Sequence, residues 1–264
     1  MWLTAKPIHQ PCFSSIPSPT TTLTHTPFHC CVASSANSPP MVLKKRNRYR
    51  KLYPGENTGI TEEMRFVAMK LRNTKSQERL PIEGAGDSDT WQPSMDGFLN
   101  YLVDSKLVFD TVESIVDESE NVSYTYFRKT GLERSEGLAK DLEGFKEQGV
   151  VIPNPNSPGV TYAEYLKELG ERSGPLFLSH FYNIYFSHIA GGQVIAKQVS
   201  KSLLEGKELE FYRWEGDVPE LLKDVRENLN MLSEHWSRDE KNRCLKETTK
   251  SFRYMGEIVR LIIL

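Results

Sequence analysis

A pair of glycines, Gly191 and Gly192, lies inside a long segment whose other residues favour a helix. Each glycine lowers helix propensity by about 1 kcal/mol relative to alanine, so the presence of two glycines inside a helix indicates a structural or functional requirement for them. Because glycine has no side chain, a flat ligand can lie directly against the backbone at this point. The alternative interpretation is a close contact with a second helix, or a kink.

The residues before the glycines supply further parts of such a site. The segment 179–189 is dense in aromatic side chains, which suit a slot for an apolar ligand. It contains His180 and His188, which are about two helical turns apart and therefore can face one side. Either histidine can instead be a buried residue whose hydrogen bonds are satisfied.

Helices are predicted throughout the body of the chain. Apolar residues spaced i, i+3, i+4 and i+7 after Thr61 predict a first helix that ends near Asn73, followed by a polar surface insertion over 74–93. Further helices are expected over 94–117, 132–148, from 161, over 176–204, over 220–236 and from 237 to 264.

Two of these helix starts carry a capping box, Thr161 with Glu164 and Ser237 with Glu240. The helix over 176–204 is expected to be interrupted at the two glycines. The fold class is therefore predicted as all-α, a single domain of seven or eight helices.

Composition limits the function classes. The 264 residues, 38% hydrophobic and 26% charged, fit one domain plus a tail. A formal charge of -2 gives no overall basic field, so no nucleic-acid partner is expected. The longest uncharged stretch, 7–43, is rich in Ser, Thr and Pro and therefore predicts no membrane span. Only Cys244 lies in the body, which excludes a disulfide framework or a cysteine metal cluster there.

The first 40 residues read as a targeting segment. Residues 1–40 contain no Asp or Glu, twelve Ser or Thr, and one charged residue, Lys6, which is typical of a chloroplast transit peptide. The alternative is a disordered tail on a cytosolic protein. Residues 41–58 include six basic residues in 44–51 and are interpreted as a solvated, largely unstructured segment, with a nucleic-acid patch as the alternative. The helical domain is predicted over 59–264.

The segment 179–193 resembles the distal helix of heme oxygenases, where a glycine-rich kink lies against the porphyrin face. The plant plastid branch is the best match, over nearly the whole mature chain. Four other segments carry the resemblance: 62–69, 101–108, 131–134 and 210–214. The resemblance implies a helical fold that holds heme between a proximal and a distal helix. It also implies an enzyme that takes electrons from ferredoxin and opens heme to biliverdin.

The resemblance assigns the site residues one at a time. Gly191 and Gly192 match the distal glycines, with Ser187 and His188 beside them on the distal side. His188 stands where many non-plant members have a water-organising Asp, and plant members carry His there.

Three further positions match the ligand-binding residues of the family. Tyr182 matches a pocket tyrosine, and Arg65 and Arg226 match basic positions that pair with the porphyrin propionates. Arginine suits that role because it stays charged and binds carboxylates bidentately. Taken alone, each arginine can also be a surface charge.

One departure from the family decides the functional prediction. The resemblance places Arg72 where active members carry the histidine that ligates the heme iron. A guanidinium keeps its proton and has no free lone pair, so it cannot ligate iron. The segment 60–73 offers no His, Cys or Tyr in its place. We therefore expect no catalytic residue and no metal ligand, weak or absent heme binding, and binding of protoporphyrin or another tetrapyrrole.

The chain thus resembles the histidine-lacking class of plant heme-oxygenase-like proteins. This implies an inactive paralogue in the chloroplast stroma that modulates tetrapyrrole, phytochrome-chromophore or chlorophyll metabolism. The alternatives are an active ferredoxin-dependent enzyme that recruits another ligand and yields biliverdin, CO and Fe2+, or a protein-interaction scaffold. Ferredoxin or tetrapyrrole-pathway proteins are the candidate partners, with Lys and Arg of 197–253 available for docking.

Overall fold

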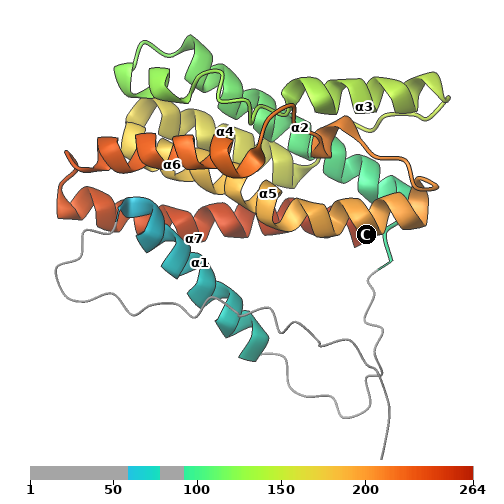
Figure 1. Ribbon diagram of the computed structural model, residues 1–264. Coiled ribbons are helices and arrows are strands. Elements are labelled where there is room, and N and C mark those ends of the chain that lie inside the picture. The colour runs from blue at the N-terminus through green and yellow to red at the C-terminus, as the bar shows by residue number, and fades with distance from the viewer. Residues whose placement is uncertain (1–58, 78–91, 264) are drawn as a thin grey trace, which may run out of the picture. The chain divides into compact units, whose positions relative to one another are not determined.

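The computed structural model describes residues 59–77 and 92–263, and every regular element in these ranges is a helix (Figure 1). This confirms the predicted all-α fold. The α-helices are α1 (Ile60–Gln77), α2 (Met95–Glu118), α3 (Ser135–Glu147), α4 (Ser157–Arg172), α5 (Gly174–Leu203), α6 (Val218–Ser233) and α7 (Arg238–Arg260). The described ranges also contain three 3-10 helices: η1 (Val122–Phe127) between α2 and α3, η2 (Glu210–Tyr212) between α5 and α6, and η3 (Leu261–Ile263) after α7.

Several sequence predictions fall outside these ranges. The transit peptide over 1–40, the basic segment over 41–58 and most of the insertion over 74–93 are not among the described residues. Within the described ranges, no helix combines the length and the apolar character needed to cross a bilayer.

Helix α5 is the core element of the bundle. Its first half is buried on all sides, which is typical of a helix in the middle of a fold. It packs against α7, α4 and α6, and Figure 1 shows it alongside α7. The helix is continuous across Gly191 and Gly192, so the predicted interruption is wrong. Packing against these neighbours offsets the propensity cost of about 1 kcal/mol per glycine.

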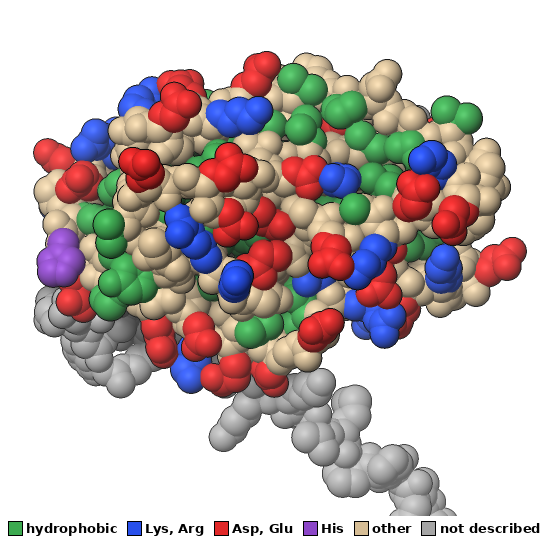
Figure 2. Space-filling view, turned by 90° about the horizontal axis from the view of Figure 1, so that it is seen from above, with side chains coloured by type: hydrophobic (Ala, Val, Ile, Leu, Met, Phe, Trp, Pro, Cys, Tyr) green, Lys and Arg blue, Asp and Glu red, His purple; other side chains and the backbone are tan. Residues whose placement is uncertain are grey.

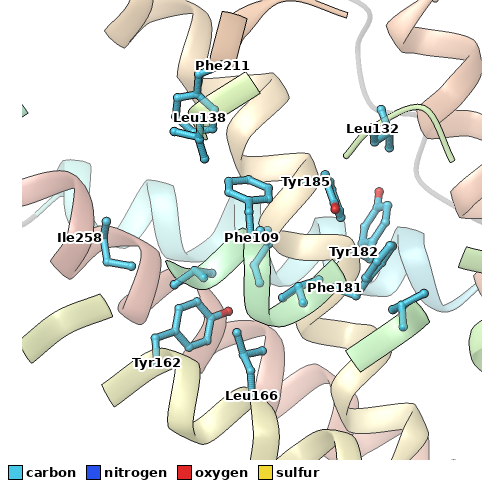
Figure 3. Close-up of a cluster of buried hydrophobic side chains, with 14 of the residues drawn as sticks. Phe109, Leu132, Leu138, Tyr162, Leu166, Phe181, Tyr182, Tyr185, Phe211 and Ile258 are labelled. Carbon is cyan, nitrogen blue, oxygen red and sulfur yellow. The ribbon is translucent and has the colours of Figure 1, made fainter. Parts of the chain in front are cut away.

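An aromatic cluster joins α5 to α2 and η2. The ring of Phe109 lies 5.4 Å from that of Tyr185 and 5.7 Å from that of Phe211. In the close-up, Phe109 is near the centre, with Phe211 and Leu138 on one side of it (Figure 3). Such tilted and edge-on ring pairs hold the three segments in fixed relative positions.

The start of α4 differs from the sequence prediction. The helix begins at Ser157, and Thr161 lies inside it, so the capping box predicted at Thr161 is wrong. The carboxylate of Asp104, on α2, accepts hydrogen bonds from the backbone N–H of Asn156 at 2.6 Å and of Gly159 at 2.8 Å. The N-terminus of α4 is therefore capped by a side chain 52 residues away in the sequence, and not by Thr161 as the local sequence pattern predicts.

Other boundaries shift by about one turn. α1 continues to Gln77 instead of ending near Asn73, and α3 begins at Ser135 instead of Leu132. The capping box of Ser237 with Glu240 is confirmed, since both of its reciprocal hydrogen bonds are present.

Replacing Asp104 by alanine should destabilise the fold. The change leaves two backbone N–H groups without their acceptor at a fully buried site, and we expect a loss of about 3 kcal/mol in the free energy of unfolding. Urea unfolding followed by circular dichroism measures the loss. Asp110→Ala, on the same helix, removes a part-exposed pair with Lys106 and should cost less than about 0.5 kcal/mol. Equal losses in the two variants would contradict the proposed cap.

Candidate functional site

A cavity of about 410 Å³ lies among α1, α2, α5, η2 and α7, and its walls are mostly apolar. Several residues singled out in the sequence line it: Arg72, Ser187, His188, Gly191 and Gly192. Phe186, from the aromatic segment 179–189, lines it as well. Other lining residues were not singled out as site residues in the sequence: Tyr101, Ser105, Phe109, Phe211, Phe252, Met255, Gly256 and Val259. The cavity therefore has the apolar character that a flat hydrophobic ligand requires.

The two glycines of α5 play different roles. A Cβ atom on Gly191 would meet nothing within 4 Å, so Gly191 leaves open space at the cavity wall. A Cβ atom on Gly192 would lie 3.1 Å from Nδ1 of His188 and 3.3 Å from Cε1 of Tyr212. Gly191 thus gives a ligand access to the backbone, and Gly192 makes room for the His188 side chain.

A third glycine contributes to the same cavity. Gly256, in α7, also meets nothing within 4 Å of a built Cβ atom. Gly256, like Gly191, lies inside a predicted helix, where glycine lowers helix propensity. This feature of the sequence could have identified it as a candidate site residue. The aromatic residue Phe252 of the same helix gives no comparable local signal.

His188 is a neutral imidazole held in one orientation. Its Nε2 lies 3.0 Å from the backbone carbonyl oxygen of Phe211, which can only accept, so Nε2 carries the proton. The rings of Phe211 and Tyr212 stack on the imidazole at 4.2 and 5.4 Å. Burial lowers the pKa of His188 to about 3, against the opposing effect of the bond to Phe211, and the charge of Arg134 lowers it further.

His180 lies outside the cavity lining, although it shares a helix with His188. Its Nδ1 is 2.9 Å from the Tyr162 hydroxyl and its Nε2 is 3.0 Å from Oε2 of Glu247. Burial alone would raise the pKa of Glu247, but hydrogen bonds from His180, Lys250 and Tyr165 outweigh it and lower the pKa to about 2. Burial lowers the pKa of His180 as well, so His180 is a buried histidine with satisfied hydrogen bonds.

Tyr182, matched to a pocket tyrosine, and the two arginines matched to the propionate-pairing positions, Arg65 and Arg226, form a group of their own. Burial raises the pKa of Tyr182 to about 12, while the charge of Arg226 opposes that rise, the charge of Glu62 adds to it and the charge of Arg65 opposes it. None of the three is among the residues that line the cavity. The ring of Tyr182 stacks at 5.9 Å on Phe186, which does line it, so the basic group adjoins the cavity through this pair.

Arg72 is the residue that α1 contributes to the cavity wall. Its side chain is exposed, and it lies two helical turns after Arg65 on the same helix. A guanidinium is permanently protonated and has no lone pair, so it cannot act as a ligand to a metal in the cavity.

Comparison with known proteins points to one family. The family model described as heme oxygenase matches residues 92–261. A protein of Arabidopsis thaliana named "Probable inactive heme oxygenase 2, chloroplastic" is 65% identical, over 84% of this chain and 80% of that protein. "Heme oxygenase 1, chloroplastic" of the same species is 51% identical, over 82% and 78% of the two chains.

Solved structures show the same fold. The crystal structure of heme oxygenase-2 from Synechocystis in complex with heme and NO matches with a TM-score of 0.61 and 19% identity, over 78% of this chain and 85% of that chain. Heme oxygenase from Leptospira interrogans matches with a TM-score of 0.59 and 20% identity, over 76% and 98%. At these identities the likeness concerns the fold alone.

The two glycines should respond differently to alanine. Gly191→Ala adds a methyl group to open space and should raise the free energy of unfolding by up to about 1 kcal/mol through helix propensity. Gly192→Ala should lower it by about 1 kcal/mol, because the added atom displaces His188 and Tyr212. Urea titrations of both variants measure this difference. Indistinguishable stabilities would show that Gly192 is not packed as described.

His188 should make stability fall with acidity. The unfolded chain takes up a proton below pH 6.5 while the folded histidine stays neutral until about pH 3, so stability is lost as the pH falls across that range. At pH 5 the loss from this residue is about 2 kcal/mol. In His188→Gln this component is absent, so unfolding measured at pH 7 and pH 5 should show a decline smaller by that amount. A parallel decline in both proteins would contradict the prediction.

Proposed function

This chain belongs to the heme oxygenase family, and we propose that it is a catalytically inactive member that binds a metal-free tetrapyrrole in the plastid. The observation that carries the proposal is the position of Arg72 in the cavity wall, on the helix where the family resemblance expects the iron-ligating histidine. The relative that is 65% identical bears a name that describes an inactive protein, which supports the same conclusion.

The cavity suits a flat ring but not an axial ligand from α1. Gly191 on α5 and Gly256 on α7 leave open space on two helices that pack together, so a planar apolar molecule finds backbone on both. An iron porphyrin needs a donor with a lone pair for axial ligation. Arg72 has none, so the residues on α1 do not fit heme held by a proximal ligand.

The basic group next to the cavity supports a ligand with carboxylates. The charges of Arg65 and Arg226 lower the pKa of Tyr182, and the ring of Tyr182 stacks on Phe186, which lines the cavity. We propose that these two arginines pair with the propionates of the tetrapyrrole, while the apolar walls bury its ring. Such binding needs no metal.

The proposal extends to location and partners. The composition of residues 1–40 and the chloroplastic names of the plant relatives support a plastid, with the stroma as the proposed compartment. There the protein would modulate the supply of tetrapyrroles, including phytochrome chromophore or chlorophyll precursors. On the face seen in Figure 2, Lys and Arg alternate with Asp and Glu. That face does not favour the basic docking surface that ferredoxin needs.

A second candidate is an active, ferredoxin-dependent heme oxygenase. It is favoured by His188, a neutral imidazole that lines the same cavity, and by 51% identity to a relative named heme oxygenase 1. In that case His188 or another donor would replace the missing ligand.

Titration with porphyrins separates the two candidates. We expect protoporphyrin to bind, and hemin to give neither a sharp Soret band nor biliverdin when reductant and ferredoxin are supplied. Binding is followed by tryptophan fluorescence quenching, and turnover by absorbance. Biliverdin formation by the unmodified protein would overturn the proposal in favour of the enzyme.

Arg72→His should restore axial ligation. A new ligand bond worth at least about 1.4 kcal/mol should tighten hemin binding roughly tenfold and produce a Soret band typical of histidine-ligated heme. Lys70→His, on the same helix but outside the cavity lining, is the matched control and should leave hemin binding unchanged. An Arg72→His protein without a heme spectrum would show that the cavity itself has diverged.

A further inference from the structure

A row of three buried polar side chains lies outside the residues that line the cavity. Tyr162 of α4 and His180 of α5 are both 0% exposed, and Glu247 of α7 is 6% exposed. The Tyr162 hydroxyl lies 2.9 Å from Nδ1 of His180, and Nε2 of His180 lies 3.0 Å from Oε2 of Glu247. Figure 3 shows Tyr162 among the buried core residues. The three residues are named here the buried triad.

The directions of the two hydrogen bonds follow from the charge of Glu247. Burial raises the pKa of Glu247, but three hydrogen bonds to its carboxylate, including that of His180, lower it to about 2, so the group is ionised at neutral pH. Because a carboxylate only accepts, Nε2 of the neutral His180 carries the proton and Nδ1 holds a lone pair. The Tyr162 hydroxyl therefore donates to Nδ1. A hydroxyl, a base and an orienting carboxylate thus follow one another, as in the triads that activate nucleophiles.

Burial excludes a substrate from the buried triad. Neither Tyr162 nor His180 has exposed surface, so no substrate reaches the hydroxyl. Burial also raises the pKa of Tyr162 well above its usual range, so the hydroxyl does not lose its proton alone. An electron needs no channel, and a phenol that loses an electron releases its proton to a hydrogen-bonded base. The product is a neutral phenoxyl radical, which a buried site does not penalise as it penalises a phenolate.

A stacked tyrosine pair connects the buried triad to the helix that walls the cavity. The ring of Tyr254, on α7, lies 4.6 Å from that of Tyr162, and the two planes differ by 6°. Tyr254 directly precedes Met255, which lines the cavity together with Phe252 and Gly256. At 3.6 residues per turn, these lining residues share one face of α7, and Tyr254 lies on the opposite face. One helix, about 10 Å across, therefore separates the tyrosine pair from the cavity.

We propose that Tyr162 is a redox-active tyrosine that supplies one electron to a photo-oxidised tetrapyrrole in the cavity, while His180 takes its proton. This inference rests on the proposed function and gives it a further activity. A metal-free porphyrin keeps its excited state long enough to lose an electron, whereas a bound iron quenches that state. A protein that holds such a ring in an illuminated plastid therefore needs a way to repair the oxidised ring.

The step balances in electrons and protons. The light-excited ring passes one electron to a quinone, which is reduced, and the ring becomes a radical cation. One electron then moves from Tyr162 to the ring by way of Tyr254, the O–H bond of Tyr162 breaks, and an N–H bond forms at Nδ1 of His180. The products are the neutral ring, a phenoxyl radical and an imidazolium. The carboxylate of Glu247 offsets the charge of the imidazolium, and a soluble reductant of the ascorbate class restores the tyrosine.

The buried triad is tested first without a tetrapyrrole. In the full chain, a light flash oxidises tris(bipyridine)ruthenium(II) in the presence of a cobalt(III) acceptor, and the ruthenium(III) takes one electron from the protein. We expect a long-lived tyrosyl radical in electron paramagnetic resonance and its loss in Tyr162→Phe. Tyr126→Phe changes a 45% exposed tyrosine and should leave the signal unchanged. No radical in the unmodified protein, or a radical that persists in Tyr162→Phe, overturns the inference.

The part of His180 is tested through the proton. After exchange into heavy water, the radical should show a deuterium hyperfine coupling from the deuteron that moved to Nδ1. His180→Gln keeps polar groups at the site but offers no base, so the long-lived radical should be lost. If His180→Gln does not fold, Glu247→Gln should lower the radical yield, because it removes the charge that stabilises the imidazolium. Glu164→Gln, an exposed change on α4, is the control. An unchanged radical in the variants that fold overturns the role of His180.

The link to the cavity is tested with light. With protoporphyrin and a quinone added to the unmodified protein, illumination should produce the same tyrosyl radical. In Tyr162→Phe the porphyrin radical cation should persist instead, and the porphyrin should bleach faster, while Tyr126→Phe should behave as the unmodified protein does. Transient absorption measures both species, and circular dichroism shows that the variants fold.

The outcomes separate this inference from the function on which it rests. A porphyrin radical cation that decays equally fast in Tyr162→Phe and in the unmodified protein overturns the inference and leaves tetrapyrrole binding intact. Absence of protoporphyrin binding overturns the proposed function and the light-driven step together. The ruthenium experiment needs no tetrapyrrole, so it shows independently whether the buried triad carries a radical.

Discussion

The burial of the first half of α5 is the constraint on which the rest of the structure depends. A helix surrounded by protein must satisfy its polar side chains without water, and each partner it finds fixes a neighbouring element. Ser179 bonds the carbonyl oxygen of Cys244, and His180 bonds Glu247, which sets the register of α5 against α7. His188 bonds the Phe211 carbonyl and so ties η2 to the same helix.

The same constraint explains why one helix carries both scaffold and site. His180 and His188 have the same chemistry, and burial keeps both neutral. Their surroundings differ: both nitrogens of His180 are hydrogen-bonded within the protein, whereas His188 is hydrogen-bonded through Nε2 and belongs to a residue set that lines the cavity. Gly192 makes this possible, because any larger residue would occupy the space of the imidazole.

The sequence predicted those features of the fold that depend on nearby residues. Apolar spacing predicted the helices, and the capping box at Ser237 was visible because its two partners are three residues apart. The start of α4 was not predictable in this way, since its cap is Asp104 on another helix. The predicted interruption of α5 failed for a related reason: propensity is local, and tertiary packing overrides it.

In the candidate site, too, features that depend on nearby residues were predicted and features that depend on tertiary structure were not. The glycine pair and the aromatic run before it pointed to the cavity, and the resemblance added Arg72 and His188. The wall formed by α7 and the hydroxyl of Ser105 were missed, because nothing in a helical pattern tells which face will meet a ligand. Only the spatial structure separates the cavity from the adjoining basic group around Tyr182.

The packing of α1 affects how readily this segment of the protein is proteolysed. Among the described elements this helix packs chiefly against α7 and α6, and Phe66 and Met69 remain 65% and 37% exposed on it. A molecule seated against Arg72 would add a contact to this helix, and so raise the free energy of its local opening. Occupancy would thereby slow proteolysis of this segment, and the amount of protein that persists in the cell would record how much ligand is present.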